Sequence, residues 1–171
     1  EKYGVDKPDL RNPLELIEVK ELFKECDFKV FNEPANDKDS RIAAIKVPNG
    51  KLLTRKQIDD YTEFVGNYGA KGLAYIRVED PSKGKEGLQS PIIKFIEDSI
   101  IESLLSTLQV QEGDIIFFGA GKRSIVNDSL AALRDLVAKD LDLLTCEWAP
   151  CWVVDFPMFE KNRSGDLTPL H

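Results

Sequence analysis

Only one histidine occurs in the 171 residues, and it is the last residue, His171. A Ser-His-Asp or Cys-His catalytic arrangement needs a histidine held inside the fold, so the sequence favours neither. Carboxylates are abundant, but nothing in their spacing places two of them in a dry pocket, and most are expected on solvated faces. We therefore expect no catalytic residue within this chain.

The three cysteines, Cys26, Cys146 and Cys151, are an odd number without a paired framework. This pattern predicts buried, reduced thiols in a cytosolic protein. A zinc site with four ligands would need more donors than these thiols and one histidine provide. We therefore expect no bound metal.

The stretch GAGKRS, residues 119–124, lies between a predicted strand and a predicted helix, a place where proteins often hold phosphates. A Walker loop needs Ser or Thr directly after its Gly-Lys pair, but Arg123 follows Lys122 here. A nucleotide-binding loop is therefore not expected. Two interpretations stay open: a tight strand-to-helix turn, or a docking point where helix N–H groups, Lys122 and Arg123 meet a nucleic-acid phosphate.

The formal net charge of -7 opposes a general attraction to nucleic acid, so contact with phosphates must come from local basic spots. Besides Lys122 and Arg123, the candidates are Lys71 on a glycine-flanked turn, and Arg55 and Lys56 on the first turn of a helix. For each of these residues the alternative interpretation is a solvated cation without a ligand.

Two amphipathic helices are predicted strongly. Thr54, followed three residues later by Gln57, is the pattern of a capping box, and Gly69 is a typical residue at a helix end. Apolar residues then recur at helical steps. In the first helix they are Ile58, Tyr61, Val65 and Tyr68, and in the second, over residues 124–141, they are Val126, Leu130, Leu133, Val137 and Leu141.

The remaining patterns predict strands, loops and weaker helices. The predicted strands are FKVF (28–31), RIAAIKV (41–47), GLAYIRVE (72–79), GDIIFFGAG (113–121) and WVVDFPMF (152–159). Residues 13–26 predict a loose helix, residues 91–108 one or two helices, and residues 32–40 and 160–171 loops. The order β-β-α-β-(αα)-β-α is typical of an α+β fold with helices on one face of a four-stranded sheet.

Five stretches are informative together. They are YGVDKPDLRNPLEL (3–16), LTRKQID (53–59), YGAKGLAYIRV (68–78), GDIIFFGAGK (113–122) and WAPCWVVDFPMFE (148–160). In this order and spacing they resemble bacterial-type aspartyl-tRNA synthetase over nearly the whole chain. The common family form of the first stretch has Ser where this chain has Val5.

The resemblance implies an insertion inside a class II catalytic domain, the GAD domain, which also occurs in subunits of tRNA-dependent amidotransferases. It implies a two-layer β-β-α-β-β-α fold of the GAD/DCoH-like type, with extra helices. The implied boundaries are residues 1–13 for the exit from the catalytic core, 14–147 for the insertion, and 148–171 for the return, with a core strand and part of a substrate loop.

The resemblance also implies the activity of a parent enzyme, which activates L-aspartate with ATP and Mg²⁺ and transfers it to tRNA. That parent would be cytoplasmic and homodimeric, without a membrane contact. The insertion would be accessory and non-catalytic, would bind no cofactor, and would have the catalytic core of its own polypeptide as a partner. His171 matches the first of a His-His pair that helps to bind aspartate in the family.

Two alternatives remain beside this interpretation. The chain could be a freestanding tRNA- or protein-interaction module of the same fold, or part of a tRNA-dependent amidotransferase. It could also be an unrelated small enzyme, against which the lack of an internal histidine counts. The stretch WVVDFPMFE discriminates between an insertion and a freestanding module, because a freestanding module has no use for a core strand of another domain.

Overall fold

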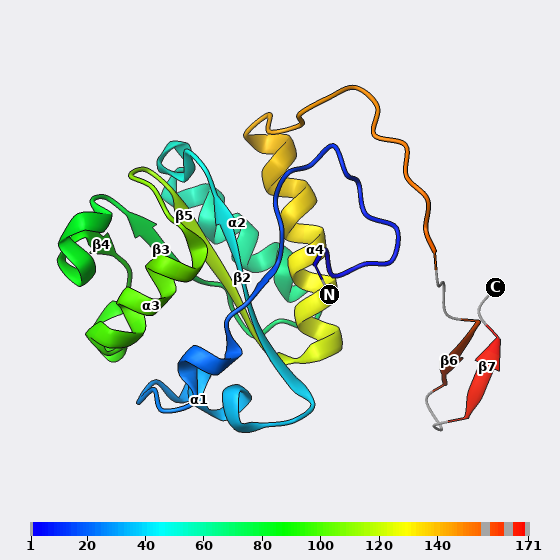
Figure 1. The fold of residues 1–171 in the computed structure, drawn as a ribbon, viewed down its shortest axis with the longest axis horizontal. Coiled ribbons are helices and arrows are strands. Elements are labelled where there is room, and N and C mark those ends of the chain that lie inside the picture. The colour runs from blue at the N-terminus through cyan, green and yellow to red at the C-terminus, as the bar shows by residue number, and fades with distance from the viewer. Residues whose placement is uncertain (1, 155–157, 163–165, 170–171) are drawn as a thin grey trace.

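The computed structural model describes residues 2–154, 158–162 and 166–169. Most of these residues surround a five-stranded antiparallel sheet with the strand order β1-β2-β5-β3-β4 (Figure 1). The strands are β1 (Ile17–Glu18), β2 (Ser40–Val47), β3 (Ala74–Val78), β4 (Leu88–Gln89) and β5 (Ile115–Lys122). A separate hairpin of β6 (Phe159–Lys161) and β7 (Leu167–Pro169) lies at the end of an extended segment.

The two long strands β2 and β5 form the centre of the sheet. They pair along their whole length, from Ser40 opposite Lys122 to Val47 opposite Ile115. Side chains alternate between the two faces of a strand, and both faces of β5 are buried here. Phe117 belongs to the apolar cluster on one face, and Phe118 belongs to the cluster on the other face. This explains why the stretch IIFF is continuously apolar rather than alternating.

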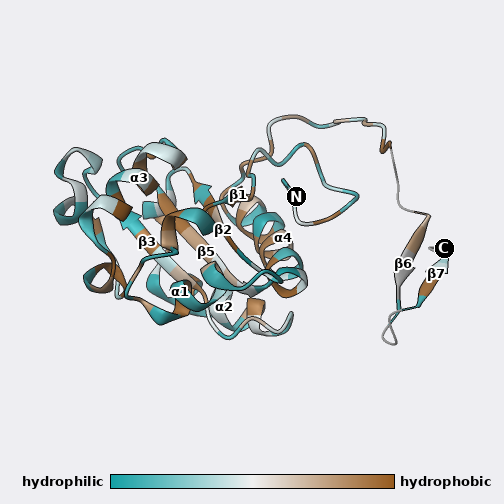
Figure 2. Cartoon of the chain, turned by 60° about the horizontal axis from the view of Figure 1, so that its bottom comes forward, coloured by the Kyte–Doolittle hydropathy of each residue, from teal (hydrophilic) through white to brown (hydrophobic). Residues whose placement is uncertain are grey.

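Helices cover both faces of the sheet (Figures 1 and 2). The α-helices are α1 (Lys29–Asn36), α2 (Arg55–Gly66), α3 (Asp98–Leu108) and α4 (Arg123–Asp140), and the 3-10 turns are η1 (Lys20–Phe23), η2 (Gly50–Leu52), η3 (Pro81–Gly87) and η4 (Ile93–Phe95). One face carries α2 and α4, and the other carries η1, α1 and α3. The α+β class is confirmed. The sequence predicts helices on one face of the sheet, whereas the structure has helices on both faces.

The capping box at the start of α2 is confirmed. The Gln57 backbone N–H donates to Thr54 Oγ1 at 3.2 Å, and the Thr54 N–H donates to Gln57 Oε1 at 2.9 Å. Ile58, Tyr61 and Val65 are buried against the sheet, as their spacing predicts. The exposed Tyr68 lies beyond the last turn, and Gly69 ends the segment with a φ of +89°.

Three predictions for the N-terminal third are wrong, and one of them is the loop over residues 32–40, because residues 32–36 belong to α1. The run FKVF is not a strand, because residues 29–36 form α1, whose Phe31 and Ala35 lie one helical turn apart and are both buried. Residues 13–26 form β1 and η1 rather than a helix. The reason is that Leu14 and Leu16 pack on one face of the sheet while Val19 and Phe23 pack on the other, which a single helix face cannot achieve.

The segment that precedes β1 is fastened along α4 by a buried arginine. Arg134 is 1% exposed, and its guanidinium donates to three backbone carbonyl oxygens, those of Leu14 at 2.5 Å, Asp9 at 2.9 Å and Asn12 at 2.6 Å. Its charge is paired with Asp135 at 3.0 Å. The N-terminal segment is therefore part of the folded body, although it has no secondary structure of its own.

The C-terminal part differs from its prediction where it is described. Residues 152–154 are not in a strand, residues 155–157 lie outside the described residues, and residues 167–169, predicted as loop, form β7. His171 also lies outside the described residues. Across the ranges that the structure describes, no helix combines the length and apolarity that a membrane span requires.

A candidate binding groove beside strand β5

Among the described strands, the second half of β5 has a neighbour on one side only. Strand β3 pairs with β5 from Arg77 opposite Ile115 to Ala74 opposite Phe118, and there its pairing ends. Residues 119–122 continue to pair with β2. The edge of β5 that β3 covers along residues 115–118 is therefore open along residues 119–122.

The hydrogen-bond pattern shows which backbone groups face this open edge. The Val78 N–H donates to Asp114 O at 2.9 Å, so the C=O of Asp114 faces β3. Backbone groups of an antiparallel strand alternate between its two sides, and those of Ile116, Phe118 and Ala120 therefore face the same way. The pairing of β3 ends opposite Phe118, so among the described strands none lies beside the N–H and C=O of Ala120 on this edge.

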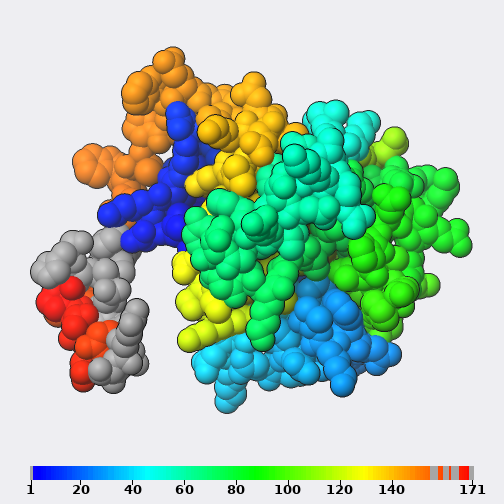
Figure 3. Space-filling view, turned by 180° about the vertical axis from the view of Figure 1, so that it is seen from behind, coloured from blue at the N-terminus to red at the C-terminus, as the bar shows by residue number. Residues whose placement is uncertain are grey.

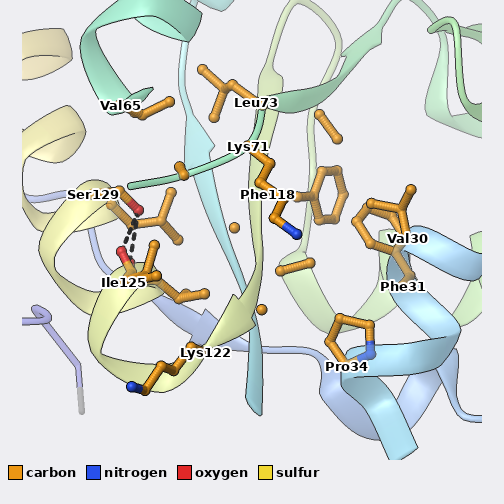
Figure 4. A pocket seen from close by; sticks show the side chains of 18 of the residues that line it. Val30, Phe31, Pro34, Val65, Lys71, Leu73, Phe118, Lys122, Ile125 and Ser129 are labelled. Atoms are coloured by element: carbon orange, nitrogen blue, oxygen red, sulfur yellow. Dashed lines mark hydrogen bonds between the residues drawn. The ribbon is translucent and has the colours of Figure 1, made fainter. Parts of the chain in front are cut away.

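A groove of about 760 Å³ lies over this edge, and we call it the β5-edge groove (Figure 4). Val30, Phe31 and Pro34 of α1 form one wall, and Ile125 and Ser129 of α4 form the other. The loop of residues 69–73, between α2 and β3, closes one end of the groove. The groove thus occupies the position in the sheet plane that a further strand would take.

Gly119 sets how closely α4 approaches the floor of the groove. A Cβ at this position would lie 3.0 Å from Leu130 and 3.1 Å from Val126, closer than most real Cβ contacts. The absent side chain lets α4 pack directly on β5. Ala120, whose side chain belongs to the opposite apolar cluster, leaves space on the side of α1. Small residues in the stretch GAG therefore shape the groove.

Three lysines and one glutamate line the groove, so its local charge is opposite in sign to the net charge of -7. They are Lys29 and Glu33 on α1, Lys71 on the closing loop, and Lys122 at the end of β5. Figure 4 shows the Lys71 side chain extending over β5 towards Phe118, with Lys122 at the other end of the strand. All three lysines are exposed and can meet an anionic group.

The structure brings together only some of the five cations that the sequence singles out. Lys71 and Lys122 line the groove, and Arg123 is the adjoining first residue of α4. Arg55 and Lys56 lie at the start of α2, whose opposite end reaches the groove through Val65. A helix of 12 residues is about 18 Å long, so one phosphate cannot meet both sets.

The strand-to-helix turn at GAGKRS is confirmed, since β5 ends at Lys122 and α4 begins at Arg123. The first N–H of α4 is already used, because the Arg123 N–H donates to Asp39 O at 3.1 Å. A phosphate bound at this turn would therefore contact mainly the side chains of Lys122 and Arg123, and fewer free backbone N–H groups. Arg55 is also engaged, in an ion pair with Asp59 at 3.4 Å.

Comparison with known families places this groove in a recognised module. The family model of the GAD domain matches residues 31–130, which is more than half of the chain. The chain belongs to the GAD domain family. This module is found in class II aminoacyl-tRNA synthetases. The matched range contains all of β2, β3 and β5 and the first part of α4, and hence nearly the whole groove.

Sequence reasoning missed Lys29 as a residue of this GAD domain groove, because it assigned FKVF to a strand. The pattern of Phe31 and Ala35, four residues apart, was the available signal for a helix. A helix there would have placed Lys29 and Glu33 one turn apart on a common face. The groove itself has no sequence signature, since it results from where the pairing of β3 stops.

The cysteines of the GAD domain chain are only partly as predicted. Cys26 is buried, and burial raises the pKa of its thiol. Cys146 and Cys151 are exposed, so the prediction of buried thiols is wrong for these two. They lie in the extended segment after α4, which has no core to enclose them. Among the described residues, no group of three or more His, Cys, Asp or Glu residues could hold a metal ion.

The segments that flank the GAD core lie side by side (Figure 3). The backbone N–H of Thr145 donates to Arg11 O at 2.9 Å, and its hydroxyl donates to the same oxygen at 3.0 Å. Arg11 also binds the Asp9 carboxylate at 2.7 Å, and this hydrogen-bonded partner lowers the pKa of Asp9 to about 2. The chain therefore approaches and leaves the GAD core at one place.

Proposed function

We propose that this GAD domain is the insertion of a bacterial-type aspartyl-tRNA synthetase, with short flanks that belong to the catalytic core. The observation that carries the proposal is the contact of Arg11, in the N-terminal flank, with Thr145, at the C-terminal end of the insertion, beside a core that belongs to the GAD family. A domain inserted into another needs its two connections close together, so that the host fold is not disturbed.

The C-terminal flank supports this proposal through its exposed apolar side chains. Trp148 is 79% exposed and Trp152 is 95% exposed, and Val154 and Met158 are exposed as well. Large apolar residues gathered on one segment mark a contact surface. A catalytic core packed against this flank would bury them. A freestanding module would leave them in water.

The insertion has an accessory role in this proposal. Activation of aspartate by ATP to aspartyl-adenylate and the transfer to tRNA would occur in the catalytic core, where ATP and Mg²⁺ would bind. His171, by its match to the family loop, would contribute to aspartate binding in the whole enzyme. The GAD domain would provide no group to the reacting atoms.

For tRNA, we expect phosphate contacts through Lys71, Lys122 and Arg123, which the structure brings to one region. Arg55 and Lys56 form a second candidate contact, separated from the first by the length of α2. Phosphate contacts position a nucleic acid without reading its sequence. Binding by this domain alone should be weak, because its net charge of -7 repels the tRNA backbone.

The test uses the full-length protein that contains this segment. Exchange between ATP and pyrophosphate is measured in the presence of each of the twenty amino acids in turn. The 171-residue chain serves as the matched control. We expect exchange with aspartate for the full-length protein and none for the control. Formation of amide on Asp-tRNA without exchange would instead assign the domain to a tRNA-dependent amidotransferase and overturn the proposal.

The tRNA contact is tested separately with Lys122→Ala/Arg123→Ala in the full-length enzyme. Each lost phosphate contact should reduce the slope of log K against log salt by about one. An unchanged affinity and slope would show that these cations are solvated surface residues. The exchange activity with aspartate would remain in either case, so the two tests fail independently.

A further inference from the structure

The β5-edge groove contains the elements of a strand-binding site. Ala120 presents an N–H and a C=O on the open edge, in line with the hydrogen bonds that Phe118 makes to β3. Helix α1 and helix α4 lie on opposite sides of the vacant position, as they would around a buried strand. An extended peptide placed there would continue the line of β3 and pair with β5.

The walls and charges indicate the chemistry of the occupant. Side chains of an added strand would alternate between the apolar wall of Val30 and Pro34 and that of Ile125. Lys29, Lys71 and Lys122 surround this apolar centre, and Glu33 is the one opposing charge among the described residues that line it. The groove therefore complements apolar residues with acidic residues beside them.

We propose that the β5-edge groove binds an extended acidic peptide segment of another protein, which adds a strand to the sheet beside Ala120. Single-stranded nucleic acid fits the groove less well, because bases bind to exposed aromatic rings. The aromatic residues here, Phe31 and Phe118, are each only 1% exposed. This inference does not depend on the activity of the parent enzyme, but the peptide would compete with tRNA for Lys71 and Lys122.

Panning of a random heptapeptide phage library on the immobilised 171-residue chain provides the probe. The counter-target is Lys29→Glu/Lys71→Glu, which reverses two charges of the groove. The control is Lys38→Glu/Lys139→Glu, which makes the same change of net charge at two exposed residues outside the groove. Circular dichroism and thermal melting establish that both variants are folded.

We expect selection of peptides in which apolar residues alternate and Asp or Glu flank them. Their Kd should rise about tenfold in the groove variant, as expected for the loss of two charge pairs and their replacement by repulsion, and should stay within about twofold in the control. In an NMR titration of the unmodified chain, the selected peptide should shift the Ala120 amide and slow its hydrogen exchange.

Four outcomes would overturn the proposal. The library could yield no enrichment of acidic residues, or the selected peptides could bind the groove variant as tightly as the unmodified chain. The Ala120 amide could also remain unchanged at saturating peptide. Binding of a dodecamer of uridylate that depends on Lys29 and Lys71, with no selected peptide, would identify a nucleic-acid surface instead.

Discussion

The two halves of β5 contrast within a single strand of eight residues. Residues 115–118 have a strand on each side and helices on both faces, and they are almost completely buried. Residues 119–122 pair with β2, and among the described residues with no strand on the other side; residues 119–121 are small and partly exposed, and Lys122 is exposed. The first half contributes most to stability. The second half keeps its backbone groups and the surrounding lysines accessible, so binding can evolve there at little cost to the core.

The strongest test of this contrast truncates one side chain in each half. Phe117 is fully buried and packs edge-on against Tyr61, with ring centroids 6.0 Å apart. Phe117→Ala should lower the free energy of unfolding by about 3–5 kcal/mol, because it leaves a cavity at the centre of the sheet. Denaturant titration measures this change.

The matched variant is Ala120→Ser in the open half, where the free energy of unfolding should change by less than about 1 kcal/mol. Equal losses for the two variants would contradict the division of β5 into a stabilising half and an accessible half.

The next largest effect concerns the arginine that holds the N-terminal segment on α4. Arg134→Ala removes the donor shared by the carbonyls of Leu14, Asp9 and Asn12. The free energy of unfolding should fall by about 2–4 kcal/mol, because buried carbonyl groups lose their partners. Limited proteolysis should then cut the N-terminal segment first, while α4 remains as the wall of the groove.

If the protease cuts the rest of Arg134→Ala while the N-terminal segment stays intact, the guanidinium does not hold this segment on α4. Arg11→Ala is the comparison variant, since Arg11 is partly exposed and its pairing with Asp9 is local in sequence. It should cost less than about 1 kcal/mol.

A smaller effect is expected at the start of α2, far from the open half of β5. Thr54→Ala removes the acceptor for the Gln57 N–H and should lower the free energy of unfolding by about 1 kcal/mol. Thr54→Ser retains the hydroxyl and should restore most of the loss. Affinity of the groove for its peptide should not change in either variant, and a parallel loss of affinity would link the groove to global stability.

The smallest effect is the acid dependence of the Asp9–Arg11 pair. Its hydrogen bonds with Arg11 lower the pKa of Asp9 from 3.8 to about 2. A carboxyl whose pKa is lower in the folded state stabilises that state above the unfolded pKa. The contribution should therefore be complete above about pH 4 and disappear as the pH falls through about 2.

The comparison variant for this pH effect is Asp9→Asn. Its unfolding free energy should approach that of the unmodified chain as the pH falls from 4 to 2, measured by urea titration. A constant difference over this range would show that the pair does not titrate as described.

Local sequence rules predicted some parts of this fold well. The capping box at Thr54 and the helical spacing of Val126, Leu130 and Val137 depend on neighbours close in sequence, and both are confirmed. The run FKVF was ambiguous, because a pattern of only four residues fits a strand as well as the start of a helix. Tertiary packing of Phe31 on the sheet determined the outcome.

The groove shows what local rules cannot supply. Its lysines come from α1, from the loop before β3 and from the end of β5, which are distant in sequence. Lys71 and Lys122 were recognised from their turns, but Lys29 was not. Local rules also could not show that Arg55 lies at the end of α2 far from the groove. The open edge arises because β3 pairs with only half of β5, a property of two strands together.

Amide hydrogen exchange of β5, read residue by residue by NMR in the unliganded chain, tests the central claim most directly. We predict that Ile116 and Phe118, whose N–H groups face β3, exchange only through large-scale opening, and that Ala120 exchanges at least about a thousandfold faster. Comparable protection of Ala120 and Phe118 would contradict the account, because the edge of β5 would then be closed.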